Sequence, residues 1–141
     1  MAIVAAVDRS KKAGKVVQEA KILGEAFDDD VHVIHVLSRS SFVELERTSV
    51  EERGTPVDMD RVRNIAREIA SEAAEGVGGS VETVGLMGDA SERILEYADE
   101  HDARYVVVGT RKRSPTGKAV FGSVSQSVLL NSDVPVVAAP L

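Results

Sequence analysis

Apolar residues fall into two kinds of pattern along this chain, and the first kind is a near-continuous run. Four segments are apolar almost throughout and rich in β-branched residues: residues 2–7, 31–37, 105–108 and 134–139. Short runs of this kind are typical of strands that are buried on both faces of a parallel sheet. Residues 80–86 alternate apolar and polar positions, which indicates a fifth strand nearer the edge of the sheet.

The second pattern, between these runs, has apolar residues at the three- and four-residue spacing of an amphipathic helix. It predicts a helix over residues 13–27 and another over residues 62–73. Asp89 and Glu92 form a capping-box pattern that predicts a third helix, and a fourth is expected from about Gly122 to Leu130. Residues 38–57 show no sustained period, so we expect a lid or binding loop there, with a mobile tether as the alternative.

Strands and helices therefore alternate, which predicts a single α/β domain over residues 1–141 with helices on both faces of the sheet. Right-handed crossovers favour an open five-stranded parallel sheet in the order 3-2-1-4-5. Ligands of such sheets bind outside the carboxyl ends of the strands, where the winding direction reverses. Asp8 follows the first strand and Gly109 ends the fourth, so both are expected at that point.

Composition excludes several classes of protein. The 141 residues contain no cysteine, which excludes disulfide scaffolds, zinc ribbons and thiol nucleophiles. A net charge of -6 argues against wrapping of duplex nucleic acid by phosphate neutralisation. The N-terminal apolar run meets Asp8 after seven residues, too early for a signal peptide or a membrane span, so we expect a cytoplasmic protein without a membrane partner.

Positive charge is concentrated near the C-terminus. No acidic residue occurs between Asp102 and Asp133, and five basic residues lie in that interval: Arg104, Arg111, Lys112, Arg113 and Lys118. Gly109, Gly122, Ser123 and Ser125 accompany them at the start of the fourth predicted helix, and free N–H groups at a helix N-terminus bind anions. The alternatives are a solvated basic loop, and a Ser123 that only caps the helix. Neither a Walker A loop nor a Gly-x-Gly-x-x-Gly dinucleotide motif is present.

The histidines do not predict a catalytic or metal centre. His32 and His35 are expected on opposite faces of the second strand, and His101 follows the third helix. We interpret His35 as a structural residue, and no Ser-His-Asp spacing is present, so no catalytic residue is predicted.

Several segments together resemble the universal stress protein family over essentially the whole chain. They are residues 4–10 (Val-Ala-Ala-Val-Asp-Arg-Ser), 35–37 (His-Val-Leu), 107–109 (Val-Val-Gly), 121–125 (Phe-Gly-Ser-Val-Ser) and 134–137 (Val-Pro-Val-Val). The nucleotide-binding branch of that family carries Gly, two residues, Gly, nine residues, then Gly-Ser/Thr around ATP. Gly109, Gly122 and Ser123 match, but Lys112 replaces the second glycine. Where the backbone is left-handed, a non-glycine residue costs about 1–2 kcal/mol, although a lysine can compensate by contacting a phosphate.

The resemblance implies the Rossmann-like fold of this family and a cleft that binds ATP, alone or with Mg²⁺. Asp8 would bond the adenine or ribose and Val36 would pack on the base, while Gly109, Gly122, Ser123 and Val124 would bind ribose and phosphates. Val7, Val108 and Arg111 complete the expected set, with Arg113 and Lys118 as further phosphate partners. The alternative role for Asp8 is to cap the first helix. We expect an ATP-dependent stress-response switch with at most slow ATP hydrolysis; the alternative is a nucleotide-free dimeric interaction module, with Lys112 as its mark.

A homodimer is expected through the C-terminal strand. Residues 134–139 form an edge strand in the predicted order, apolar and uncharged, and such an edge invites pairing. Pro135 and Pro140 remove two donors, which limits growth while allowing a short two-fold pair. Many members of the family that the chain resembles dimerise through this strand.

Overall fold

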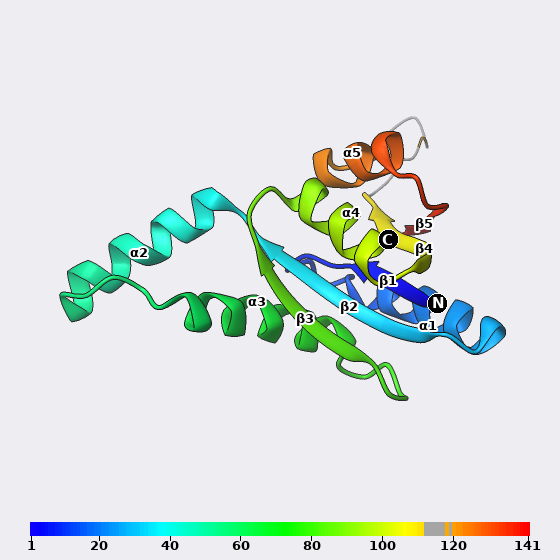
Figure 1. Ribbon diagram of the computed structural model, residues 1–141, viewed down its shortest axis with the longest axis horizontal. Helices are drawn as coiled ribbons and strands as arrows, with labels where there is room; N and C mark the ends of the chain where they lie inside the picture. The colour runs from blue at the N-terminus through cyan, green and yellow to red at the C-terminus, as the bar shows by residue number, and fades with distance from the viewer. Residues whose placement is uncertain (112–117, 119) are drawn as a thin grey trace.

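The fold is an open parallel sheet whose strands are β1 (Ala2–Ala6), β2 (Asp30–Leu37), β3 (Glu82–Met87), β4 (Ala103–Thr110) and β5 (Val136–Pro140). In this computed structural model, which describes residues 1–111, 118 and 120–141, the strands lie in the order β3-β2-β1-β4-β5. Every adjacent pair is parallel (Figure 1). The predicted strand order is therefore confirmed, and the winding reverses between β1 and β4.

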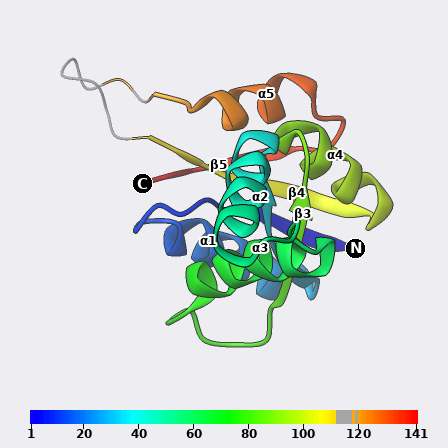
Figure 2. The same ribbon diagram turned by 90° about the vertical axis from the view of Figure 1, so that its left-hand side faces the viewer.

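In the described residues five helices, two on each face of the sheet and one apart, join the strands: α1 (Gly14–Phe27), α2 (Arg39–Arg53), α3 (Met59–Ala74), α4 (Ala90–Glu100) and α5 (Ser123–Asn131). Helices α1 and α3 cover one face, where Val17 and Ala70 pack against Ile3 and Ala5 of β1. Helices α4 and α5 cover the other, where Ile94 and Val128 pack around Val4 (Figures 1 and 2). Successive residues of β1 thus enter opposite cores, which explains its unbroken apolar run.

The loop predicted over residues 38–57 is wrong, because most of that segment is helix α2. The Ser38 side chain caps the helix by accepting from the Ser41 N–H, and Gly54 ends it with a φ of 72°. None of its residues is buried, and only Phe42 and Leu45 pack in part against a small cluster around Leu37. The helix projects from the sheet (Figure 1) and has no full face to bury, so its sequence lacks the usual apolar period.

The predicted cap of α4 is confirmed, and the starts of two strands differ by two residues from the prediction. The Asp89 carboxylate accepts from the Glu92 N–H at 3.1 Å and caps α4, as the capping-box pattern predicts. Strand β3 begins two residues later than predicted, at Glu82, and β5 begins at Val136. No helix among the described residues is long and apolar enough to cross a membrane.

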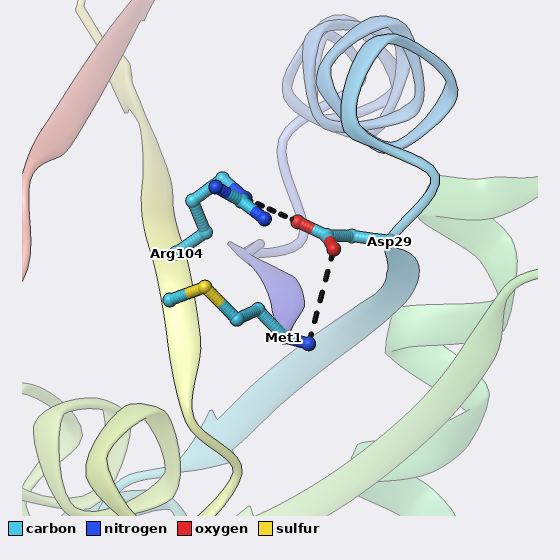
Figure 3. A network of polar contacts seen from close by, with 3 residues as sticks. All are labelled: Met1, Asp29 and Arg104. Carbon is cyan, nitrogen blue, oxygen red and sulfur yellow. Dashed lines mark hydrogen bonds and ion pairs between the residues drawn. The ribbon is translucent and has the colours of Figure 1, made fainter.

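An ionic network joins the amino ends of the strands, away from the predicted binding edge. The Asp29 carboxylate accepts from Arg104 Nε at 2.6 Å and lies 3.8 Å from the amino group of Met1 (Figure 3). The Arg104 guanidinium also lies 4.5 Å from the centre of the Phe27 ring. Arg104 is near the amino end of β4 whereas Gly109 is near its carboxyl end, so Arg104 does not belong to the predicted anion site.

Candidate functional site

A cleft opens at the carboxyl ends of β1 and β4, where the winding of the sheet reverses. Its lining includes all nine residues that the sequence singled out for cofactor binding: Val7, Asp8, Val36, Val108, Gly109, Arg111, Gly122, Ser123 and Val124. They come from β2, β4 and α5 and from the segments that follow β1 and β4. Residues separated by more than 100 positions therefore share one surface, and their role in binding remains a prediction.

One side of the cleft is apolar. Val36 and Val108 are buried in the core beneath α4 and α5, and Val7 is buried in the core beneath α1 and α3. Ile34 and Ile94 extend the same wall. A wall of branched aliphatic side chains with few polar atoms suits a flat, uncharged ring.

Asp8 forms a turn of its own rather than the cap of α1. Its Oδ1 accepts from the Ser10 N–H at 2.8 Å, and the Ser10 hydroxyl accepts from the Lys12 N–H at 3.2 Å. Helix α1 begins at Gly14 without any side-chain cap, so the alternative role for Asp8 is wrong. The carboxylate is exposed at the mouth of the cleft, and its second oxygen has no partner among the described residues.

The N-terminus of α5 presents to the cleft backbone donors that have no partner among the described residues. Gly122 occupies the N-cap position without a side-chain bond, and the Gln126 N–H makes the first helical bond, 2.9 Å from the Gly122 carbonyl. The N–H groups of Ser123, Val124 and Ser125 therefore precede the helical ladder and lie at the positive end of the helix dipole. Such a terminus attracts anions.

The two serines of this turn differ in availability. Ser125 donates its hydroxyl to the Gly109 carbonyl at 2.9 Å, so that hydroxyl is already engaged. Ser123 is exposed at the first position of the helix, and its hydroxyl has no partner in the part of the chain that the structure describes. Because Gly122 is the cap, the reading of Ser123 as a simple N-cap is wrong.

Arg111 places a positive charge beside this helix terminus. Its backbone N–H donates to the Val120 carbonyl at 2.7 Å, and its Nε lies 3.2 Å from the position that a Cβ on Gly122 would occupy. The guanidinium therefore lies over Gly122. Lys118 is exposed, whereas the predicted phosphate partner Arg113 and the motif departure Lys112 lie outside the described residues.

Gly109 is required by packing. A Cβ at this position would come within 2.8 Å of the Leu141 side chain and 3.2 Å of Val16. Real Cβ atoms essentially never approach another heavy atom as closely as the first of these distances. The glycine thus lets α1 and the C-terminal residue close over the end of β4.

His35 is a lining residue whose place in the cleft the sequence reading missed. Its Nδ1 lies 2.7 Å from the Val7 carbonyl oxygen, and burial lowers the pKa of the imidazole below its ordinary value. The bond to Val7 agrees with the interpretation of His35 as a structural residue near a strand end, but that interpretation did not place the residue in the cleft. Its position beside Val36 at the carboxyl end of β2 was the available signal.

The other two histidines, His32 of β2 and His101 at the end of α4, both contact Tyr97 of α4. His32 Nδ1 lies 2.6 Å from the Tyr97 hydroxyl and its Nε2 lies 3.3 Å from Glu82 Oε2. The His101 ring stacks on Tyr97 at 3.8 Å, and its centre lies 5.5 Å from that of His32. The sequence did not indicate that His32 and His101 would share a cluster with Tyr97. The Tyr97 hydroxyl is bonded within a buried cluster, which makes it a poor nucleophile for any substrate in solution.

No group of three acidic or histidine side chains in residues 1–111, 118 and 120–141 is placed to hold a metal ion. The cleft as described has one carboxylate, Asp8, and one imidazole, His35, which is already bonded to a backbone carbonyl. The arrangement is therefore suited to binding an anionic ligand with an apolar part.

Fold and cleft together define a class: open α/β proteins that bind ligands at the carboxyl edge of a parallel sheet. The chain belongs to the universal stress protein family, which matches residues 1–140, and the resemblance seen in the sequence is confirmed. The universal stress protein MJ0531 of Methanocaldococcus jannaschii is 26% identical over 134 residues, which are 95% of this chain and 78% of that protein. A Mycolicibacterium smegmatis universal stress protein is 46% identical over 50 residues, 36% of this chain and 38% of that protein.

Solved structures give the same result. A universal stress protein from Archaeoglobus fulgidus is 28% identical with a TM-score of 0.62, covering 99% of this chain and 98% of its own. An Archaeoglobus fulgidus universal stress protein in complex with dAMP has a TM-score of 0.56 at 23% identity, covering 99% of this chain and 97% of its own. A universal stress protein in complex with cAMP has a TM-score of 0.61 at 19% identity, with 99% and 96% covered.

Proposed function

We propose that this universal stress protein binds ATP in the cleft and acts as a cytoplasmic stress-response switch, whose occupancy changes its conformation or its partners. The observation that carries the proposal is the juxtaposition of an uncapped helix N-terminus, Arg111 and an apolar wall in one cleft at the switch point. Two fold neighbours were solved with dAMP and cAMP, which supports an adenine nucleotide as the ligand class.

The nucleoside would occupy the apolar side of the cleft. Val36 and Val108 offer the base a buried aliphatic surface, and Val7 extends that surface toward Asp8. The Asp8 carboxylate, with one oxygen that has no partner in the described part of the chain, is suited to accept hydrogen bonds from ribose hydroxyls or the adenine amino group.

The phosphates would lie at the N-terminus of α5. The N–H groups of Ser123 and Val124, the Ser123 hydroxyl and the Arg111 guanidinium supply neutral and charged donors at that end of the cleft. A side chain on Gly122 would crowd the Arg111 guanidinium, because a Cβ there would lie 3.2 Å from Arg111 Nε. Mg²⁺ would bind through the phosphates, because Asp8 is the single carboxylate in the described lining.

We propose binding rather than rapid turnover as the function of this cleft. Hydrolysis of ATP requires a group that orients or deprotonates water. Asp8 and His35, the two groups in the described lining that could act as a base, belong to the proposed nucleoside half of the cleft, whereas the phosphates would lie at α5. Any hydrolysis is therefore expected to be slow.

We further propose that the protein forms a homodimer through β5. The choice of binding partners by this dimer would depend on whether nucleotide is bound. Strand β5 is the free edge of the sheet beside β4, and it carries no charged side chain. A nucleotide-free interaction module of the same fold is the competing function, and it shares this edge. Nucleotide binding therefore discriminates between the two.

The roles within the cleft are tested by comparing ATP with inorganic tripolyphosphate, which lacks the nucleoside. We expect Asp8→Ala to weaken ATP binding by about 10- to 100-fold, the usual value of a hydrogen bond to a charged group, and to leave tripolyphosphate binding unchanged. Arg111→Ala should weaken both ligands and reduce the dependence of their affinities on salt.

Glu44→Ala and Arg47→Ala are matched controls, because these charges are exposed on α2 and lie outside the cleft. Neither substitution should change the affinity for ATP or for tripolyphosphate. Equal losses of ATP and tripolyphosphate in the Asp8 variant would show that Asp8 does not contact the nucleoside.

A further inference from the structure

Val7, the residue before Asp8, is held by β2 at both its backbone N–H and its carbonyl. Strand β1 ends at Ala6, which pairs with Ile34 in the last register position of the β1–β2 ladder. Beyond it, the Val7 N–H donates to the Ile34 carbonyl at 2.9 Å, and the Val7 carbonyl lies 2.7 Å from His35 Nδ1. The His35 side chain therefore supplies the hydrogen bond to the Val7 carbonyl beyond the end of the β1–β2 ladder. Val7 is buried, and a buried carbonyl without a partner would cost free energy of folding.

This contact fixes the tautomer of His35. A carbonyl oxygen accepts hydrogen bonds and cannot donate them, so the hydrogen must be on Nδ1. Burial lowers the pKa of the imidazole, which keeps the ring neutral and leaves Nε2 with its lone pair. The residue thus serves as a fixed donor to the backbone.

The bonds that hold Val7 also restrict Asp8, the residue proposed to bind the nucleoside. Asp8 is the next residue, and its carboxylate is held in a second bond, from the Ser10 N–H at 2.8 Å. All three of Val7, Asp8 and His35 line the cleft. Moving the Val7 peptide would therefore turn the Asp8 carboxylate relative to the apolar wall.

We propose that His35 is a positioning residue of the nucleoside half of the site: its bond to the Val7 carbonyl orients the Asp8 turn toward the ligand. This inference rests on the proposed function, since it assigns His35 a part in adenine nucleotide binding. Phosphate binding at α5 and Arg111 is independent of it, because those groups come from other segments.

The test uses two substitutions that differ in one hydrogen bond. His35→Leu removes the donor, whereas His35→Asn places an amide N–H at the same number of bonds from Cα as Nδ1. We expect His35→Leu to weaken ATP binding about tenfold with tripolyphosphate unchanged, and His35→Asn to recover most of the loss.

His32→Leu is the matched control. His32 lies on the same strand and is also hydrogen-bonded, but it is buried, and its partners are Tyr97 and Glu82 outside the cleft. This variant should lose stability and keep both affinities. A His35→Leu variant that binds ATP like the wild type, or loses both ligands equally, would overturn the inference while leaving the proposed function standing.

A second readout does not depend on nucleotide. In the ligand-free protein, hydrogen exchange of the Ser10 amide by NMR reports the Asp8 turn directly. It should rise in His35→Leu, return in His35→Asn and stay unchanged in His32→Leu. If the wild type fails to bind ATP, the proposed function fails, and the role of His35 as an aid to nucleotide binding fails with it. An unchanged Ser10 amide in His35→Leu would refute the orientation of the Asp8 turn by His35.

Discussion

At the scale of single residues, Asp29 and Asp8 show how position decides what a carboxylate does. Asp29 lies at the amino ends of the strands with 5% of its side chain exposed, and Arg104 and the Met1 amino group compensate its charge (Figure 3). Asp8 lies at the carboxyl ends of the strands and is exposed, and one of its oxygens has no partner in the residues that the structure describes. The first therefore stabilises the fold, and the second is available to a ligand.

The hydrogen bond from Arg104 lowers the pKa of Asp29 below its ordinary value. A carboxyl whose pKa is lower in the folded state than in the unfolded state stabilises the fold above the unfolded pKa, about 4. That contribution is lost as the pH falls through the folded pKa. We predict that Asp29→Asn is less stable than the wild type at pH 7 and that the difference shrinks below about pH 4.

Urea unfolding at a series of pH values measures this difference. Asp28→Asn is the matched control, because Asp28 is exposed at the C-cap of α1 with a φ of 55°, which asparagine also tolerates. It should show no comparable pH dependence. A constant stability difference between Asp29→Asn and the wild type from pH 7 to pH 3 would contradict the role assigned to the Arg104 contact.

At the scale of elements, the sequence pattern predicts those that bury a face and misses the one that does not. Helices α1 and α3 each place at least four residues in a core and carry a clear apolar period. Helix α2 buries none, so the packing that produces such a period is missing. The sequence signals for α2 were its two capping residues, Ser38 and Gly54, which cap a helix whether or not it packs against the core.

Strand β5 is the element whose free edge carries the dimer prediction. Val136 and Val137 pack partly into the two cores, so a charge at either would also weaken the fold. Ala138 is exposed, and Ala138→Lys protects the edge while sparing both cores. We predict a wild-type mass of about twice 15.0 kDa by light scattering and a shift of Ala138→Lys toward the monomer.

Val43→Lys provides the comparison, because Val43 is 61% exposed on α2 and does not lie in β5. That variant should remain a dimer. A wild-type monomer at tens of micromolar, or a dimer that tolerates Ala138→Lys, would rule out the β5 interface.

At the scale of the whole molecule, the candidate site follows from topology. Parallel strands with right-handed crossovers place Asp8 and Gly109 at one edge of the sheet whatever the details of packing, so the sequence could predict the location of the cleft. The sequence predicted less well which side chains enter the cleft. His35 enters the cleft through a side-chain bond between strands, and Arg104 leaves the basic group because it lies at the other end of β4.

The central claim is that the cleft binds an adenine nucleotide, and calorimetric titration of the wild type with ATP and Mg²⁺ tests it most directly. We predict one ATP bound per chain and a melting temperature that rises with ATP. A ligand at 100 times its Kd stabilises the folded state by about 2.7 kcal/mol. The double variant Asp8→Ala, Arg111→Ala should lose the heat of binding and the rise together. No heat and no rise for the wild type at millimolar ATP would contradict the claim and favour a nucleotide-free interaction module.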